Sequence, residues 1–293
     1  MQLDFLKMQG CGNDFILIDN LSQQLELSTE QVAFLCDRRF GVGADGLIMV
    51  RPAEDLASDV FMHFLNADGS LPGICGNALL CLAKYIIELK YIEYNRHDMV
   101  IGTLTGPKPL SYSLDESGMF ATATVDMGVP RWIVADSQMK NDSGFAPGLS
   151  IVTKYGSLAF TLVDMGNPHA VVLLDEAQSD ILDLPVEEFA TLAGQLARHP
   201  SFPEIPNLEF AWLLDPAAEP DGAGIKMRVF ERGVGETLAC GTGACATVVA
   251  TATTQPIRVR MPGGCLDISW ADDGHILMTG TATTVYQGSI ELM

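Results

Sequence analysis

The sequence predicts a mixed α/β protein made of two similar halves. Two stretches carry this prediction, residues 64–84 and 230–254, and each contains a strand end, a glycine-containing loop, a Cys-Gly pair and a helix. Aligned on Cys75 and Cys240, they also share a phenylalanine, a loop glycine and a second cysteine, and the spacings differ by one residue on each side. A degenerate repeat of this kind indicates two related halves. The length of 293 residues is sufficient for two domains.

The first half is expected to combine short strands with two helices. A capping box of Ser28 and Gln31 predicts a helix that ends near Arg38, and a second helix is expected over 77–91, with an i,i+4 pair of Lys84 and Glu88. Strands are expected where apolar residues alternate or cluster: 3–8, 15–19, 47–50, 60–65 and several short segments between 98 and 127.

The segment 41–46 matches the pattern GxGxxG, but a dinucleotide site is not expected there. In a dinucleotide-binding fold the glycines follow an apolar strand and open a helix. Here Arg38-Arg39-Phe40 precedes the segment and an apolar strand follows it, so a turn between strands is the better interpretation.

The second half begins near Gly128, and its central feature is the helix that follows Cys240. Small residues fill the first turns of that helix, which suits burial on all sides, and Pro256 is expected to stop it. A further helix is expected over 186–198, and surface loops over 137–148 and 216–224. Strands are expected at 160–164, 225–230, 257–261, 266–270 and 284–292, the last of which could pair with the first half.

Composition and charge exclude several classes of protein. The net charge of −20 argues against nucleic-acid and anionic-membrane partners. The N-terminal residues do not resemble a signal peptide and no apolar run is long enough to span a bilayer, so a cytoplasmic location is expected. Seven cysteines, an odd number without a CxxC pair, argue against a disulfide framework and a structural zinc site.

A cysteine at a helix N-terminus has a chemical use. Unpaired N–H groups and the helix dipole stabilise an anion there, and they can lower the pKa of a thiol from about 8.5 to about 3.5–7.5. If Cys75 and Cys240 face each other, one thiolate can remove a proton from carbon while the other thiol returns a proton to the opposite face. Such a two-base device inverts a stereocentre without a cofactor or a metal.

Each of these residues also has a plain structural interpretation. A single cysteine at a helix start is more often inert and buried, but its recurrence in both halves favours a functional pair. Asn13 either reaches a ligand or holds its turn. Glu231 and Arg232 would alone indicate a surface ion pair, and His169 is equally compatible with a structural role and with supporting the site from behind.

Taken together, the motifs resemble the diaminopimelate epimerase family, whose wider superfamily includes proline racemases. The resemblance covers the whole chain in the family's order. The residues that carry it are Gly12-Asn13-Asp14-Phe15, Asn66-Ala67-Asp68-Gly69-Ser70, Cys75-Gly76-Asn77, Gly166-Asn167-Pro168-His169, Asn207, Glu231-Arg232-Gly233, Gly235-Glu236-Thr237 and Ala239-Cys240-Gly241-Thr242-Gly243-Ala244-Cys245.

This resemblance implies two pseudo-symmetric α/β (α+β) domains, each with a central helix wrapped by a mostly antiparallel, curved sheet. The N-terminal domain would cover 1–125 plus a returning strand at 282–293, and the C-terminal domain 126–281. It further implies an active site between the domains and a homodimer, in which Tyr286 resembles an interface position.

The resemblance also implies an activity and a set of site residues. The activity is cofactor-independent interconversion of LL- and meso-diaminopimelate, a step of lysine and cell-wall precursor biosynthesis, with Cys75 and Cys240 as acid and base. The reacting α-carboxylate would be bound by Gly76, Asn77, Gly241 and Thr242. The rest of the substrate, largely its distal amino-acid end, would be held by Asn13, Asn66, Asn167, Asn207, Glu231 and Arg232.

The chain departs from the family's usual pattern after Cys75. Ala78 stands where a glycine is common, and Leu80 where an arginine is common. These departures leave room for a same-fold racemase of another amino acid, such as histidine. A catalytically inactive binding protein is a third hypothesis, against which the presence of both cysteines argues, and a pyridoxal enzyme lacks a suitable lysine and phosphate loop.

Overall fold

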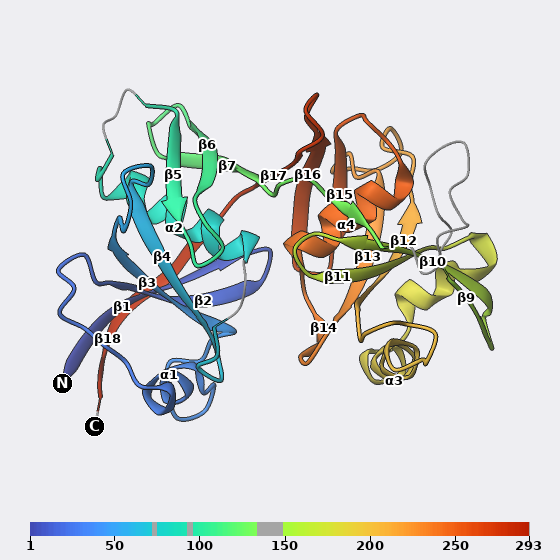
Figure 1. The fold of residues 1–293 in the computed structure, drawn as a ribbon, viewed down its shortest axis with the longest axis horizontal. Coiled ribbons are helices and arrows are strands. Elements are labelled where there is room, and N and C mark those ends of the chain that lie inside the picture. Colours follow the sequence, from blue (N-terminus) through green and yellow to red (C-terminus); the bar gives the residue numbers. More distant parts are fainter. Residues whose placement is uncertain (72–74, 93–95, 134–148, 293) are drawn as a thin grey trace. The chain divides into compact units, whose positions relative to one another are not determined.

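The computed structural model describes residues 1–71, 75–92, 96–133 and 149–292, so the expected loop at 137–148 lies outside the described residues. The chain forms two compact units (Figure 1). Unit 1 contains Met1–Asp126 and Thr279–Met293, and unit 2 contains Met127–Met278. Among the described residues, no helix is long and apolar enough to cross a membrane.

Unit 1 is a mostly antiparallel sheet around one helix, α2 (Gly76–Glu88). Its last strand, β18, is the C-terminal segment of the chain, which returns to pair antiparallel with β1. Only the β2–β3 and β4–β5 pairings are parallel among the described pairs of this unit. The strands are β1 (Gln2–Gly10), β2 (Asn13–Asp19), β3 (Gly46–Pro52), β4 (Val60–Asn66), β5 (Asp98–Gly102), β6 (Lys108–Leu114), β7 (Phe120–Asp126) and β18 (Thr283–Glu291).

Helix α2 is central because its apolar residues pack in several directions. Residues 76–83 are all buried, and the helix packs against β1, β2, β3, β4 and β7. The expected Lys84–Glu88 ion pair forms on its more polar side. A second helix, α1 (Thr29–Cys36), begins with the expected capping box of Ser28 and Gln31 and covers a separate apolar cluster of β1, β2 and β3.

Unit 2 repeats this plan around helix α4 (Gly241–Thr251), in which residues 241–249 are all buried. The helix ends where Ala252 adopts a left-handed conformation (φ 59°), four residues before Pro256, so proline is not the direct stop. The strands are β8 (Arg131–Trp132), β9 (Leu149–Thr153), β10 (Gly156–Asp164), β11 (Pro168–Leu173), β12 (Asn207–Leu213), β13 (Ile225–Glu231), β14 (Gly235–Thr237), β15 (Ile257–Met261), β16 (Gly264–Trp270) and β17 (Ile276–Gly280).

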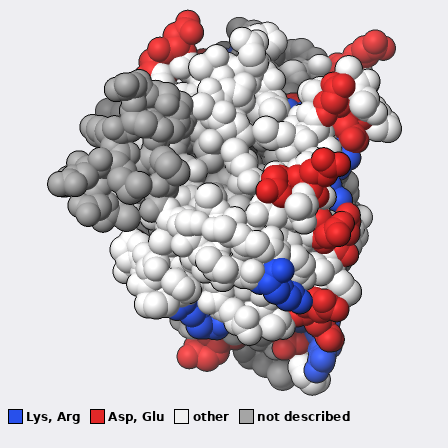
Figure 2. Space-filling view, turned by 90° about the vertical axis from the view of Figure 1, so that its right-hand side faces the viewer, with Lys and Arg blue, Asp and Glu red and all other residues white. Residues whose placement is uncertain are grey.

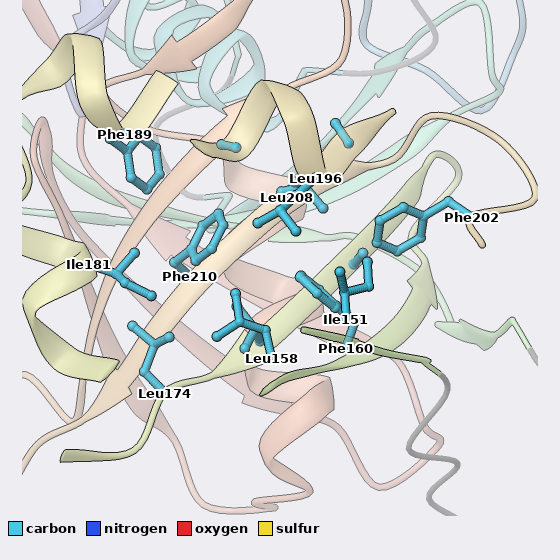
Figure 3. Close-up of a cluster of buried hydrophobic side chains, with 14 of the residues drawn as sticks. Ile151, Leu158, Phe160, Leu174, Ile181, Phe189, Leu196, Phe202, Leu208 and Phe210 are labelled. Atoms are coloured by element: carbon cyan, nitrogen blue, oxygen red, sulfur yellow. The ribbon is translucent and has the colours of Figure 1, made fainter. Parts of the chain in front are cut away.

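A second apolar core of unit 2 lies between the sheet and two further helices, the 3₁₀ helix η1 (Glu176–Asp183) and α3 (Val186–Ala197). Edge-to-face contacts between Phe189 and Phe210 and between Phe160 and Phe202 hold its centre (Figure 3). Helix α4 contributes no residue to this core, and it packs against β10, β11, β12 and β16.

Two sequence expectations need correction. The segment 41–46 connects α1 to β3, so it is a turn between a helix and a strand rather than between two strands. The helix after Cys75 ends at Glu88, because the chain turns at Leu89 and Lys90, where Lys90 has a positive φ of 55°. His169 lies on β11.

The acidic composition is visible at the surface. Figure 2 views the side of the molecule that lies on the right in Figure 1, and it shows a broad uncharged area bordered by acidic side chains, with few basic ones.

Candidate active site

The two cysteines of the repeat occupy equivalent backbone positions. Cys75 is the N-cap of α2, with φ −131° and ψ 109°, and Cys240 is the N-cap of α4, with φ −136° and ψ 114°. In both cases an extended residue precedes a glycine that begins a buried helix. The first N–H groups of such a helix have no partner within the helix, so each unit presents backbone donors beside a thiol.

In unit 1, two asparagines lie at the cysteine. The Cys75 thiol is 3.7 Å from Asn13 Oδ1, which also accepts a hydrogen bond of 3.4 Å from Asn77 Nδ2. Asn77 is only 2% exposed, and its Oδ1 finds no hydrogen-bond partner among the described residues. The tight turn before Asn13 contains Cys11 (φ 51°) and Gly12 (φ 77°), and its geometry delivers Asn13 to the helix start.

Asp45, which sequence reasoning did not single out, orients Asn13. Its Oδ2 accepts 2.8 Å from Asn13 Nδ2 and 3.1 Å from the backbone N–H of Asp14. Arg38 bridges the carboxylates of Asp14 and Asp45. The glycine-rich segment 41–46 therefore contributes a positioning carboxylate to unit 1. The signal available in the sequence was an acidic residue inside a turn that had no other assigned use.

The remaining predicted residue of unit 1, Asn66, stabilises its own turn. Its Nδ2 donates to Ser70 Oγ at 2.9 Å, and its backbone N–H donates to the Ser70 carbonyl at 2.9 Å. These contacts hold the loop that leaves β4, and they account for the Asn66-to-Ser70 motif structurally.

In unit 2, the cysteine is more enclosed. Cys240 is 6% exposed, and its sulfur accepts from the Gly243 N–H at 3.4 Å and lies 3.4 Å from Thr242 Oγ1. Glu231 also forms a hydrogen bond with the Cys240 side chain and accepts 2.5 Å from Thr237 Oγ1.

The surroundings of Cys240 raise the pKa of its thiol, whereas the helix start alone was expected to lower it. Burial raises the pKa of the Cys240 thiol well above its ordinary value, and the nearby carboxylates of Glu231 and Glu209 raise it further. The Thr242 hydroxyl and the Gly243 N–H lower it, as a helix start should, but they do not dominate. Burial likewise raises the pKa of Glu231. At Cys240, burial and the neighbouring carboxylates therefore outweigh the lowering of the thiol pKa that a helix start alone would produce.

A line of polar side chains leads from this cysteine into the unit. Asn167 Nδ2 lies 3.5 Å from Thr242 Oγ1, and Asn167 Oδ1 lies 2.9 Å from His169 Nε2. His169 Nδ1 is 2.6 Å from Glu209 Oε1, and both side chains are fully buried. Glu209 was missed from the sequence, where the available signal was a single carboxylate inside the apolar strand Leu208 to Ala211.

Asn207 and Arg232 form the other border of the unit 2 site. Asn207 Oδ1 accepts 2.9 Å from the Arg232 backbone N–H, and its Nδ2 donates 3.1 Å to the Pro168 carbonyl. The Arg232 guanidinium pairs with Glu204 at the surface, 2.9 Å away. Glu231 and Arg232 thus have different partners among the described residues, Thr237 for the carboxylate and Glu204 for the guanidinium.

The predicted residues therefore fall into two local sets. Asn13 and Asn77 meet at Cys75, whereas Asn167, Thr242 and Glu231 meet at or near Cys240. Within the described residues, no group of three or more His, Cys, Asp or Glu side chains is arranged to hold a metal ion.

Comparison with known proteins gives a consistent result. The family model described as diaminopimelate epimerase matches residues 5–133 and 161–285. A diaminopimelate epimerase of Synechococcus elongatus is 40% identical over 301 residues, covering 100% of this chain and 99% of its own length. One of Methanococcus maripaludis is 37% identical over 295 residues, covering 99% of this chain and all of its own length.

Solved structures with much lower identity share the fold. A hydroxyproline epimerase of Agrobacterium vitis aligns with a TM-score of 0.66 at 16% identity, over 99% of this chain and 92% of that one. A PhzF-family phenazine biosynthesis protein of Bacillus anthracis aligns with a TM-score of 0.67 at 14% identity, over the full length of both chains. On the family match, the identities over the full length and the two-domain fold, the chain belongs to the diaminopimelate epimerase family.

Proposed function

We propose that this enzyme interconverts LL- and meso-diaminopimelate without a cofactor, with Cys75 and Cys240 as a two-base pair. The observation that carries the proposal is the repeated helix start, a cysteine N-cap with the same backbone conformation in each unit and polar side chains at its sulfur. The pathway context, lysine and cell-wall precursor biosynthesis in the cytoplasm, belongs to the same proposal.

The chemistry conserves protons. The thiolate of one cysteine takes the proton from the substrate's α-carbon, and the electron pair of the C–H bond moves toward the adjacent carboxylate. The thiol of the other cysteine then gives its proton to the opposite face of the carbon, so that the stereocentre inverts and the thiol and thiolate exchange places. The mechanism requires both sulfurs to reach one α-carbon when substrate is bound.

Stabilisation of the intermediate is as important as proton transfer. General acid–base catalysis supplies about 10²–10⁴-fold, whereas a single well-aimed oxyanion donor supplies roughly 3 kcal/mol. We assign the backbone donors of Gly76, Asn77, Gly241 and Thr242 to the α-carboxylate, because they begin two buried helices beside the thiols. Such donors are already oriented and need no rearrangement during the reaction.

The remaining polar residues are assigned to the substrate's other groups. Arg232 suits a carboxylate because its planar fork can bind two oxygens, and its ion pair with Glu204 is exposed enough to be exchanged for a ligand. Asn13, Asn66, Asn167 and Asn207 supply amide donors and acceptors. Glu231 suits the substrate's ammonium group, and its carboxylate beside Cys240 also raises the pKa of that thiol, which favours the thiol form there.

The departures from the family pattern after Cys75 have a packing explanation. Ala78 and Leu80 are both fully buried in α2, so they fill the interior of unit 1. This weakens the alternative of a racemase for another amino acid, such as histidine, since neither side chain offers a polar group to a substrate. An inactive binding protein remains the contrasting hypothesis.

The test is α-deuterium incorporation into LL-diaminopimelate in D₂O, with reduced enzyme and no added cofactor. Incorporation together with the meso isomer is expected. Inversion of another amino acid in the same assay, with no exchange into diaminopimelate, would keep the mechanism and overturn the substrate. Absence of exchange into any amino acid, in folded and reduced protein, would favour the binding protein.

A homodimer is part of the proposal and has its own support. Strand β18 carries Val285 and Tyr286, which are 54% and 46% exposed, and the Tyr286 ring packs edge-on against Phe5 at 6.0 Å. Exposed apolar side chains on a strand suit contact with a second copy of the chain. Light scattering of the wild type and Tyr286→Asp should show a dimer that weakens in the variant; a monomeric wild type would contradict it.

A further inference from the structure

Glu209 is a buried carboxylate in unit 2 that the two-base mechanism does not use. It lies on β12 with no exposed surface, and one oxygen, Oε1, is 2.6 Å from His169 Nδ1. The other, Oε2, finds no hydrogen-bond partner among the described residues. A buried carboxylate with a half-satisfied hydrogen-bonding capacity is costly, and its presence in an apolar strand calls for a function.

The carboxylate lies against the first turn of the catalytic helix. A Cβ atom added to Gly243 would be 2.7 Å from Glu209 Oε1 and 3.3 Å from Cys240 Sγ. The N-terminal dipole of α4 therefore acts on Glu209 as well as on the thiol. Glu209 and Cys240 are thus neighbours of the same helix turn, although 31 positions separate them in the sequence.

A continuous polar path also joins them through side chains. It runs from Glu209 to His169 at 2.6 Å, from His169 to Asn167 at 2.9 Å, from Asn167 to Thr242 at 3.5 Å and from Thr242 to Cys240 at 3.4 Å. A second carboxylate, Glu231 on β13, also acts on Cys240, and like Glu209 it raises the pKa of the thiol.

The hydrogen bonds between His169 and Cys240 can be donated in either of two directions along this path. In one direction, a His169 ring that carries protons on both nitrogens donates to a Glu209 oxygen and to Asn167 Oδ1. Asn167 then donates to Thr242, and the Thr242 hydroxyl is left to donate to a Cys240 thiolate. Rotating the Asn167 amide by half a turn reverses the three bonds beyond His169: the amide donates to a neutral His169, Thr242 donates to the amide, and a Cys240 thiol donates to Thr242.

We propose that Glu209 is a positioning residue that anchors His169 in both of these arrangements, and that the Asn167–Thr242 path thereby matches its hydrogen-bond direction to the protonation state of Cys240. The Glu209 carboxylate accepts from Nδ1–H whether or not Nε2 is protonated, so the Glu209–His169 bond keeps its direction while the bonds from Nε2 to Cys240 change theirs. The inference rests on the proposed function, in which Cys240 must serve as thiolate in one direction of the reaction and as thiol in the other.

A test that does not depend on turnover is ¹⁵N NMR of histidine-labelled enzyme, with His169 assigned from His169→Gln. If the path links Nε2 to the Cys240 thiol, Cys240→Ser should change the Nε2 signal and its dependence on pH. Glu209→Gln, which keeps the shape and removes the charge, should change the Nδ1 signal and abolish this sensitivity to Cys240.

Glu236→Gln is the matched control. Glu236 is also a poorly exposed carboxylate of unit 2, paired with Arg228 at 2.6 Å, and its Oε2 likewise lacks a hydrogen-bond partner among the described residues. Its substitution should leave the His169 signals unchanged. Identical His169 spectra in the wild type, Glu209→Gln and Cys240→Ser would overturn the inference.

Kinetics provide the second measurement. Glu209→Gln should lower kcat by about 10²-fold, within the usual range for acid–base catalysis, while KM changes little because Glu209 does not contact substrate. If Glu209→Gln instead lowers the amount of folded protein while each folded molecule keeps the wild-type kcat, Glu209 has only a structural role. If wild-type enzyme shows no α-proton exchange, the proposed function fails, and the NMR result still decides the hydrogen-bond path.

Discussion

The two helix starts have nearly the same backbone and very different surroundings. Cys75 and Cys240 differ by only 5° in φ and 5° in ψ (−131° and 109° against −136° and 114°). Cys75 is partly exposed and faces the neutral amides of Asn13 and Asn77. Cys240 is buried and faces two carboxylates, Glu231 and Glu209, as well as a hydroxyl. Equivalent backbones thus present two chemically distinct thiols.

This difference teaches that the helix dipole alone does not determine the state of a thiol. The N-terminal donors act on Cys240, but desolvation and neighbouring negative charge outweigh them. A two-base enzyme needs one thiol and one thiolate together, and unequal surroundings are a way to hold the two cysteines in different protonation states.

The largest expected effect comes from removing either thiol. Cys75→Ala and Cys240→Ala should each lower inversion by at least about 10²–10⁴-fold, because each step needs its own proton carrier. Each variant should still exchange the α-proton of one isomer only, and the two should differ in which isomer that is. Deuterium incorporation measured from each pure isomer checks this.

The equivalent inner cysteines provide the control for that experiment. Cys81 and Cys245 are fully buried in α2 and α4, so Cys81→Ala and Cys245→Ala should retain turnover. Substantial inversion by Cys75→Ala or Cys240→Ala would contradict the two-thiol mechanism.

The difference in charge can be reversed by a pair of substitutions. Glu231→Gln removes a negative charge beside Cys240 and should lower the pKa of its thiol, whereas Asn13→Asp adds one beside Cys75 and should raise the pKa of that thiol. Cysteine ¹³Cβ shifts followed through a pH titration would report both. An unchanged Cys240 titration in Glu231→Gln would show that the carboxylate does not control the thiol.

The third residue of each helix tests the packing side of the comparison. Gly243→Ala should gain about 1 kcal/mol of helix propensity but lose about 1–3 kcal/mol by overpacking against Glu209, and kcat should fall as that carboxylate is displaced. At the equivalent position in unit 1, Ala78→Gly should cost about 1 kcal/mol with kcat retained. Urea unfolding and turnover of both variants measure this, and full activity in Gly243→Ala would be the contrary result.

The smallest expected effect is a difference in how the two sites respond to acid. Burial opposes ionisation of Asp14, but hydrogen bonds from Arg38 and Lys7 outweigh it and lower the pKa of Asp14 from 3.8 to about 2. The stability from this group is therefore complete above pH 3.8 and disappears as the pH falls toward 2. The pKa of Glu231 is raised instead. Ionisation of Glu231 therefore lowers the stability of the folded protein as the pH rises above 4.5.

Arg38→Ala should consequently weaken unit 1 only above about pH 3, and by less than about 1 kcal/mol because Arg38 is 58% exposed. Glu231→Gln should leave unit 2 no less stable at neutral pH. Amide hydrogen exchange at several pH values separates the two units. If Arg38→Ala lowers the stability of unit 1 equally at acid and neutral pH, the effect of Arg38 is not electrostatic.

Much of the fold was predictable from local patterns. The capping box of Ser28 and Gln31, the helix of small residues after Cys240 and the returning C-terminal strand were all expected and are present. Helix ends were less predictable, because α4 stops at a left-handed Ala252 that has no sequence signal. The segment 41–46 leads into a strand, as expected, but the role of Asp45 became visible only when that turn met Asn13.

The cysteine and glycine at each helix start needed only the local sequence, because N-caps, periodicity and small buried residues act over a few positions of the chain. The surroundings of each thiol depended on the tertiary structure. Strand register brings Glu209 beneath Gly243 and Asp45 beside Asn13, and burial then reverses the pKa shift that the helix start alone would produce at Cys240. Desolvation and proximity depend on the whole packed unit, so no short stretch of sequence could reveal them.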